Sequence, residues 1–410
     1  MAEVALVALA AGGIAVGFYA QPAVPKVHVG NRTWTVAWAV PAENAAAGGE
    51  QVTNAFPDGR AHDQSLRQIA EMSLGGAAFR VRFTNEDGDA PLRLARVTVA
   101  PALGGGRVDT RRMHQLAFSG NAATQIPPGA EATSDPVPMA LTTGQLLALS
   151  MAVSGTSPTP TVHQFAGRAS GISPPGSGDL TRRGDGGAFT TQTTGSFWLA
   201  TVEVLNPPGA VRAIAALGDS QTDAYFLTDG DSTWPQLLHR RLLPAPIAVI
   251  DSGLTGNTIV DVGCDICGAP MQQRVIRDVV NLPGVDTAIV MGGTNDISRG
   301  ATAGQIVHGL ASVAAILHAH AKRAILMTIP PRAPGSFGWI PSTMERIRVA
   351  VNGWIRAQTN LDGMVDADRI LADPARPTLL DPRYQRGDGT HLSAAGRAAL
   401  AAAIPLALVR

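Results

Sequence analysis

The feature that most constrains the fold is a strand–helix alternation in the second half of the chain. From Val211 onward, short apolar segments alternate with longer segments of helical periodicity. The apolar segments are AIAAL, IAVID, DTAIVMG, RAILMTI and GMVDAD, and the helical ones are WPQLLHRRL, PMQQRVIRDVV, AGQIVHGLASVAAILHAH, STMERIRVAVNGWIRAQ and SAAGRAALAAAIPLAL. Buried strands joined through helices pair in parallel and need helices on both faces. The pattern therefore predicts a parallel sheet between helices over residues 211–410.

The first half of the chain has a different pattern. Residues 30–205 contain the segments TWTVAWAV, AAFRVRFTN, LRLARVTVA and LLALSMAVSG, which alternate in part and are separated by turn-forming sequences. Such spacing favours a β-sandwich, jelly-roll-like in type. A chain of 410 residues also exceeds one core of ordinary size. We expect two domains, over 30–205 and 211–410, joined at VLNPPGAV.

The N-terminus and the charge balance bear on location and partners. Residues 1–25 include an apolar run from Val4 to Ala20 that resembles a secretory leader, although Glu3 stands where a basic residue is usual. We expect a secreted or periplasmic protein, with a lipid-embedded anchor as the alternative. No later apolar run is long enough to span a membrane. Lysine plus arginine and aspartate plus glutamate both number 32, which argues against a nucleic-acid partner.

The chain has two cysteines, Cys264 and Cys267. A zinc ribbon needs a second pair, and a redox site of the thioredoxin type needs the pair at a helix start. A local disulfide that pins a loop suits an exported protein. Two free thiols are the alternative.

Polar or glycine-rich clusters follow the first three predicted strands of the parallel sheet. They are Gly218-Asp219-Ser220, Asp251-Ser252-Gly253 and Gly292-Gly293-Thr294-Asn295-Asp296. A fourth cluster, GDGTHLSAAG, precedes the last helix and carries Asp388 and His391. Ligands of parallel sheets bind outside the carboxyl ends of the strands. The sequence therefore predicts a site at this edge.

The residues of these clusters have complementary chemistry. A serine hydroxyl such as that of Ser220 becomes nucleophilic when an imidazole takes its proton and an acid orients the ring. His391 and Asp388 supply that pair, three residues apart. The oxyanion that develops in acyl transfer needs hydrogen-bond donors, for which the candidates are the N–H groups of Ser220 and Gly253 and the amide of Asn295. This chemistry needs no cofactor and no metal.

The blocks GDSQTD, DSGLTG, GGTND and DGTH resemble those of the SGNH hydrolase (GDSL esterase/lipase) superfamily, in the family's order. The first half is similar to the N-terminal β-domain of exported bacterial members. The resemblance implies a flavodoxin-like three-layer α/β/α fold and a serine nucleophile at Ser220, with His391, Asp388, Gly253 and Asn295 in the roles given above. Gln221, Ala224 and Asp251 depart from the usual residues, and Gln221 either adjusts the acyl pocket or faces a polar neighbour.

Other polar residues in the chain have simpler explanations. Asp219 and Asp296 are expected to organise turns rather than to act as acids. His318 and His320 form an H-x-H pair at a helix end, where the helix dipole explains them without a metal. His163 is expected to be exposed on the β-domain, with a position that reaches the cleft as the alternative. These residues therefore do not compete with Ser220, His391 and Asp388.

The sequence as a whole predicts a serine esterase that works through an acyl-enzyme. Its expected substrates are small-molecule or polysaccharide esters with short acyl or acetyl groups. A lipase for long acyl chains and a non-catalytic glycan-binding protein on a hydrolase scaffold are the alternatives. The second of these predicts no reaction of Ser220 with a fluorophosphonate.

Overall fold

The computed structural model describes residues 30–209, 211–225, 227, 232–336 and 341–410. The predicted leader over 1–25 lies outside the described residues. Within these ranges, no helix combines the length and apolar character needed to cross a bilayer.

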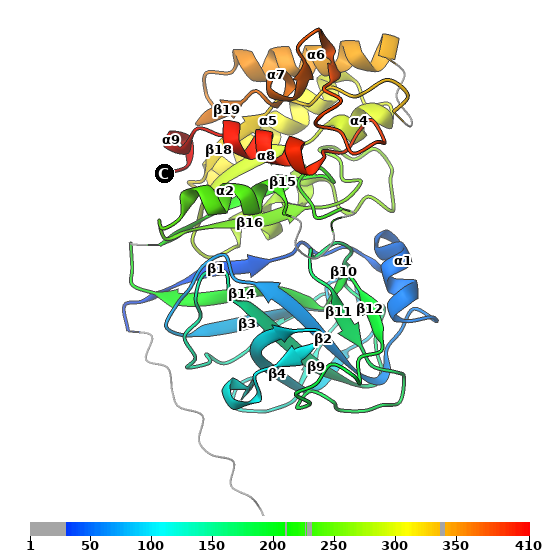
Figure 1. Ribbon diagram of the computed structural model, residues 1–410, viewed down its shortest axis with the longest axis vertical. Helices are drawn as coiled ribbons and strands as arrows, with labels where there is room; N and C mark the ends of the chain where they lie inside the picture. The colour runs from blue at the N-terminus through cyan, green and yellow to red at the C-terminus, as the bar shows by residue number, and fades with distance from the viewer. Residues whose placement is uncertain (1–29, 210, 226, 228–231, 337–340) are drawn as a thin grey trace, which may run out of the picture.

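The C-terminal region contains the predicted parallel sheet (Figure 1). Its five strands are β15 (Arg212–Gly218), β16 (Ile247–Gly253), β17 (Val285–Met291), β18 (Arg323–Met327) and β19 (Gly363–Val365). They lie in the order β16-β15-β17-β18-β19, and all neighbours are parallel. This is the strand order of flavodoxin-like sheets, whose ligand site lies where the order reverses. The fold predicted for this half is confirmed.

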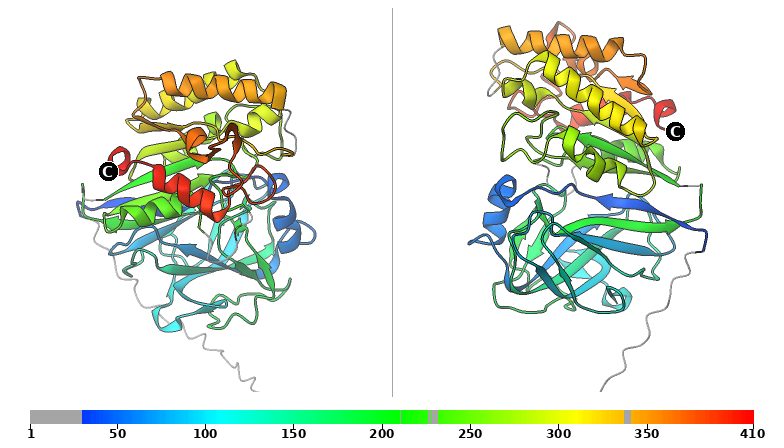
Figure 2. Two further views of the ribbon diagram at one scale, coloured as in Figure 1. Left: turned by 45° about the horizontal axis from the view of Figure 1, so that its top comes forward. Right: turned by 180° about the vertical axis from the view of Figure 1, so that it is seen from behind.

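Helices cover both faces of this sheet (Figure 2). Alternate residues of β15 divide between the faces, because Ile214 and Ala216 belong to one core cluster and Ala213, Ala215 and Leu217 to the other. The first cluster includes residues of α2 (Trp234–Leu242), α7 (Ala367–Leu371), α8 (Ala394–Ala403) and α9 (Leu406–Val409). The second includes residues of α3 (Met271–Val275) with the π turn Ile276–Val280, α4 (Thr294–Ser298), α5 (Ala303–Ala319) and α6 (Pro341–Ala357). These are the three layers that the sequence predicted.

The N-terminal region is β-rich, as predicted. One antiparallel sheet has the order β1-β14-β3-β8, formed by Thr33–Ala39, Leu199–Asn206, Phe79–Thr84 and Glu131–Thr133. A larger sheet has the order β12-β11-β2-β9-β4-β5, formed by Thr191–Thr193, Ser170–Ile172, His62–Glu71, Leu146–Thr156, Leu92–Gly104 and Arg107–Val108. Strands β6 (His114–Gln115) and β7 (Thr124–Ile126) also pair with β4, and β10 (Val162–His163) pairs with β13 (Ser196–Phe197). The jelly-roll topology stays a prediction.

Some elements were missed by the sequence analysis. Helix α1 (Ala45–Ala55) lies in a region where only strands and turns were expected. It contains Gly48 and Gly49, and Gly49 has φ of 43°, so its helical periodicity is interrupted. The short helices α4 and α7 and the hairpin of β20 (Ala372–Asp373) and β21 (Arg376–Leu380) were also missed. Each has five residues or fewer per element, which is too short for a periodic signal.

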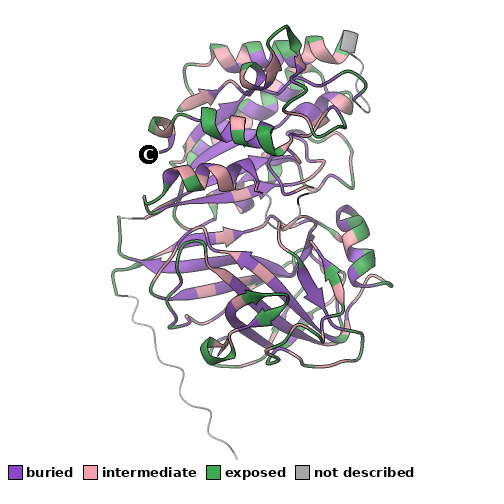
Figure 3. Cartoon of the chain, viewed as in Figure 1, coloured by how far each residue is buried: buried purple, intermediate pink, exposed green. Residues whose placement is uncertain are grey.

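The two regions pack directly on each other, with β1 against β16 (Figures 1 and 3). One cluster of buried apolar side chains runs from the β-rich region into the parallel sheet. Polar contacts cross the same boundary: Val36 N–H donates to Pro283 O at 2.8 Å, and Arg277 pairs with Glu86 at 2.6 Å. The hydroxyl of Ser73 also hydrogen-bonds the backbone of Val249. The β-rich region is therefore part of one continuous core.

Candidate active site

The site begins with a tight turn at the carboxyl end of β15. The N–H groups of Thr222 and Asp223 donate to Asp219 O at 2.9 and 3.0 Å, and Gln221 N–H donates to Asp219 Oδ1 at 2.9 Å. Burial raises the pKa of Asp219 to about 7, although the Gln221 N–H opposes this effect. A Cβ on Gly218 would lie 2.0 Å from Thr222 Oγ1, so only glycine fits there. Asp219 thus organises the turn, as expected, and Ser220 remains half-buried at its start.

The structure brings Ser220, His391 and Asp388 together. Ser220 Oγ lies 2.9 Å from His391 Nε2, and His391 Nδ1 lies 2.8 Å from Asp388 Oδ2. The backbone N–H groups of Thr390 and His391 donate to Asp388 Oδ1 at 2.9 and 2.8 Å. These bonds fix the carboxylate relative to the ring. The three side chains form one hydrogen-bonded chain that ends at a hydroxyl.

The charge states of His391 and Asp388 follow from their surroundings. Burial lowers the pKa of His391 below its usual value, although Asp388 opposes this effect. Burial alone would raise the pKa of Asp388, but hydrogen bonds from the His391 and Thr390 N–H groups and from the imidazole lower it overall. At neutral pH the carboxylate is therefore ionised and the imidazole neutral. With Nδ1–H directed to Asp388, the Nε2 lone pair faces Ser220, which is the tautomer a base requires.

Gln221 connects the serine turn to the segment that carries His391. Its Nε2 donates to Thr390 O at 2.6 Å, and its Oε1 accepts from Leu392 N–H at 3.3 Å. The side chain is buried between these two neighbours of His391. Of the two explanations left open for this residue, the structure shows the polar neighbour.

The two other predicted oxyanion donors lie at the same sheet edge but already have acceptors. Gly253 N–H donates to Asp251 Oδ1 at 3.0 Å, and a Cβ on Gly253 would lie 2.4 Å from Asp223 N. Asn295 Nδ2 donates to Asn257 O at 2.9 Å. Donation to an oxyanion would require Gly253 to exchange its bond to Asp251. The role of both residues stays a prediction.

A turn over residues 254–257 lies between the serine turn and Asn295. Thr255 Oγ1 donates to Asp223 Oδ2 at 2.6 Å, and Asn257 O accepts from Asn295. Gly256, with φ of 79°, is half-buried in this turn. Its N–H has no acceptor among the described residues. Gly256 is therefore a further donor candidate, which the sequence analysis missed.

Arg274 is a buried residue of this edge that the sequence analysis also missed. Its guanidinium donates to Gly218 O and Ser252 O at 2.9 Å, to Asn257 Oδ1 at 3.0 Å and to Asp278 Oδ2 at 3.0 Å. It thus joins the ends of β15 and β16 to the turn beside Asn295. The sequence signal that could have identified it is an arginine on the apolar, core-facing side of a predicted helical segment.

The remaining predicted polar residues have structural partners. Both oxygens of Asp296 accept from Ile259 N–H, and Oδ1 also accepts from Val260 N–H, all at 3.0 Å. His318 pairs with Asp362 at 2.8 Å, and His320 Nδ1 lies 2.9 Å from Ile316 O. Across the described ranges, no group of three or more potential ligands is arranged to hold a metal ion. The expectation that His163 is exposed is wrong, because it is 4% exposed.

Cys264 and Cys267 form the predicted local disulfide. The loop it closes packs beside the candidate site, because Asn257 Nδ2 donates to Cys267 O at 2.8 Å and to Ala269 O at 2.9 Å. The disulfide therefore supports the residue that accepts from Asn295.

Comparison with known proteins gives a match for the C-terminal region. The GDSL-like Lipase/Acylhydrolase family matches residues 216–399. No curated protein matches the chain. Solved structures similar to it include a carbohydrate acetylesterase from Sinorhizobium meliloti, at 19% identity over 47% of this chain and 96% of that one, with a TM-score of 0.38. An acetylxylan esterase from Geobacillus stearothermophilus is 22% identical over 49% of this chain and 95% of that one, with a TM-score of 0.37.

The match spans the four sequence blocks and the sheet edge at which their residues meet. Residues 216–399 of this chain form a GDSL-like lipase/acylhydrolase domain of the SGNH hydrolase superfamily.

Proposed function

We propose that this protein is a serine esterase that hydrolyses carboxylic esters through an acyl-enzyme. The observation that supports this proposal is the hydrogen-bonded chain from Ser220 Oγ through His391 to Asp388, with distances of 2.9 and 2.8 Å. The lowered pKa values of His391 and Asp388 suit a neutral base and an ionised orienting carboxylate. The family to which residues 216–399 belong acts on esters, which is consistent with this chemistry.

The proposed reaction has two halves. Ser220 Oγ attacks the ester carbonyl while His391 Nε2 takes its proton, and Asp388 stabilises the imidazolium that forms. The tetrahedral intermediate collapses, the carbon–oxygen bond to the alcohol breaks, and His391 returns the proton to the leaving alcohol. Water then attacks the acyl-enzyme in the same way and releases the acid and Ser220. No metal or cofactor enters these steps.

We propose that the oxyanion is held by the N–H of Ser220, the amide of Asn295 and a backbone N–H of the β16 end. For the last position, Gly253 was predicted from the sequence. The N–H groups of Thr255 and Gly256 have no acceptor among the described residues, whereas that of Gly253 is bonded to Asp251. Gly253 lies against the serine turn, because a Cβ there would lie 2.4 Å from Asp223 N, and Gly256 is the alternative donor.

Replacing Asn295 with alanine tests this arrangement. We expect kcat for p-nitrophenyl acetate to fall by about 10²- to 10³-fold, the loss that follows removal of one oxyanion donor. The exposed Asn360, remote from these clusters in the sequence, provides the control substitution Asn360→Ala. A normally folded Asn295→Ala protein with the wild-type kcat would contradict the assignment.

The acyl group is proposed to be short. Small residues predominate in the sequence clusters around the triad, and they do not demand a long acyl pocket. We therefore expect kcat/KM to decrease from p-nitrophenyl acetate through butyrate to octanoate. Initial rates with the three esters, with no metal added, test this order. A maximum at octanoate would instead support the lipase alternative.

We further propose that residues 30–205 form a β-sandwich domain of the jelly-roll type, that residues 211–410 form the catalytic domain, and that the protein is exported. Side chains from both N-terminal sheets share one core cluster, as a sandwich requires. The disulfide between Cys264 and Cys267 is consistent with an oxidising compartment. Acetyl esters on polysaccharides would suit such a protein.

A further inference from the structure

A buried histidine of the β-rich region lies against the turn that carries Ser220. His163 Nε2 is 3.4 Å from Asp223 Oδ1, and His163 Nδ1 is 3.4 Å from Glu43 Oε1. The exposed fractions of Glu43, His163 and Asp223 are 2%, 4% and 4%. Buried charges at this depth are stable only when they are paired. The three side chains therefore form a unit that crosses the boundary between the two regions.

His163 carries the positive charge of this unit. Burial alone would lower the pKa of His163, but Asp223 and Glu43 raise it to about 10. The imidazole is thus protonated at neutral pH and lies between two carboxylates. A third acid is close, because Asp223 also contributes to the raised pKa of Asp251, which is due first to burial. His163 is the cation that pairs directly with both Asp223 and Glu43.

Asp223 is part of the turn that presents Ser220. Its N–H donates to Asp219 O at 3.0 Å, and its Oδ1 accepts from Ala224 N–H at 2.7 Å. Its Oδ2 accepts from Thr255 Oγ1 at 2.6 Å. The position of Asp223 therefore influences both the serine turn and the turn over residues 254–257.

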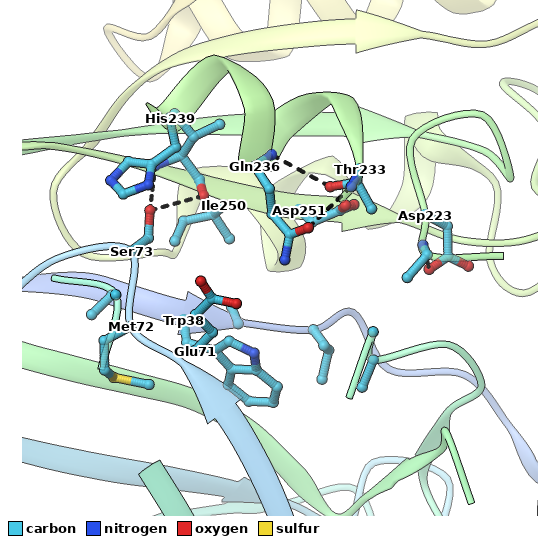
Figure 4. A pocket seen from close by; sticks show the side chains of 18 of the residues that line it. Trp38, Glu71, Met72, Ser73, Asp223, Thr233, Gln236, His239, Ile250 and Asp251 are labelled. Atoms are coloured by element: carbon cyan, nitrogen blue, oxygen red, sulfur yellow. Dashed lines mark hydrogen bonds between the residues drawn. The ribbon is translucent and has the colours of Figure 1, made fainter. Parts of the chain in front are cut away.

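A cavity borders Asp223 on the side of the β-rich region. It has a volume of about 240 Å³, and both regions contribute to its lining, as Figure 4 shows for Asp223, Thr233 and Asp251 on one side and Trp38 and Glu71 on the other. His163 also lines it. The cavity thus lies where the two regions meet beside the serine turn.

The segment that follows His163 also contacts the neighbours of the catalytic base. The ring of Phe165 packs edge-on against Tyr225, with centroids 5.1 Å apart. The ring of Tyr225 lies 4.7 Å from that of His391. A Cβ on Gly167 would lie 3.4 Å from Ala224 Cβ, so the backbone there approaches the serine turn closely. The segment from His163 to Gly167 thus follows the turn along Asp223, Ala224 and Tyr225.

We propose that His163 is a positioning residue for ester hydrolysis, whose cation, held by Glu43, fixes Asp223 and with it the turn that carries Ser220. This inference rests on the proposed function. If His163 has this role, the β-rich region contributes a residue that positions the catalytic serine.

The test is the substitution His163→Gln, which removes the charge and keeps a polar side chain. We expect kcat for p-nitrophenyl acetate to fall by about 10- to 100-fold, a loss typical of a misplaced catalytic group, while KM changes by less than about threefold. The rate at which a fluorophosphonate labels Ser220 should fall by a similar factor. A purely structural role would lower the melting temperature and leave kcat and the labelling rate of the folded protein unchanged. His318→Gln is the control, because His318 also pairs with an aspartate but is 39% exposed.

Glu43→Gln provides a second test if His163→Gln does not fold. This substitution keeps the shape of the side chain. It also keeps an oxygen that can accept the hydrogen bond from the backbone N–H of Gln164, which is 3.1 Å long in the wild type. We expect kcat to fall by at least about fivefold, since the misplaced turn again lowers the rate. Wild-type kcat and labelling rate in either folded variant would overturn the inference. Ser220→Ala with wild-type activity would instead overturn the proposed function, so the two failures are distinguishable.

Discussion

Ser220→Ala is expected to lower kcat for p-nitrophenyl acetate by about 10⁴- to 10⁶-fold, the range seen when a triad nucleophile is removed. The reason is that Ser220 Oγ, 2.9 Å from His391 Nε2, is the group that would form the acyl-enzyme. The loss of one half-buried hydroxyl should leave the fold intact. Initial rates with purified protein, together with a melting curve, provide the measurement.

Ser312→Ala is the matched control for this substitution. Ser312 lies on α5 and its hydroxyl donates to His308 O within the helix, away from the four clusters. Its activity should equal that of the wild type. Without its serine, the site could still hydrolyse the ester slowly through a water molecule activated by His391, but residual catalysis of this kind is far below a tenth of the wild-type rate. A Ser220→Ala protein that kept more than about a tenth of the wild-type kcat would therefore need another nucleophile. The nucleophile assignment would then be wrong.

Arg274→Leu is expected to lower the free energy of unfolding by about 3–5 kcal/mol, because it removes the donor of three buried acceptors, and the loss of each such bond costs about 1–3 kcal/mol. The change leaves Gly218 O and Ser252 O without the donor that joins them, and it leaves Asp278, 6% exposed, with Arg277 as its remaining ion-pair partner among the described residues. Urea denaturation of the wild type and the variant measures the difference.

The control for Arg274→Leu is Arg369→Leu. Arg369 is 78% exposed and pairs with Asp366 at 3.4 Å, so its loss should cost less than about 1 kcal/mol. A similarly small cost for Arg274→Leu would show that the ends of β15 and β16 do not depend on this guanidinium.

The position of Ser220 could be predicted because a parallel sheet places the ends of its strands at one edge, whereas Asp388 and His391, which precede the last helix, were assigned from their chemistry and from the resemblance. The apolar segments give the strands, and the residues after them then lie together without further information. The strand order confirms this logic, since β15 is paired with both β16 and β17.

The supporting contacts could not be predicted in the same way. Gln221 reaches Thr390 and His163 reaches Asp223, and in each case the partners are far apart in the sequence and in separate elements. Neither contact can be recognised from the periodicity of the sequence, because each depends on how separate elements pack against one another. The bond from Gly253 N–H to Asp251 Oδ1 is local, but it depends on a side-chain conformation that spacing does not specify. Helix α1 was missed because its glycines weaken the helical pattern.

The measurement that tests the central claim most directly is the mapping of a fluorophosphonate adduct by mass spectrometry. The wild-type protein, incubated with the probe and digested, should carry one phosphonyl group on the peptide that contains Ser220. His391→Ala should react far more slowly, because the serine then lacks its base. An adduct on another serine, or no adduct in protein that hydrolyses p-nitrophenyl acetate, would contradict the account.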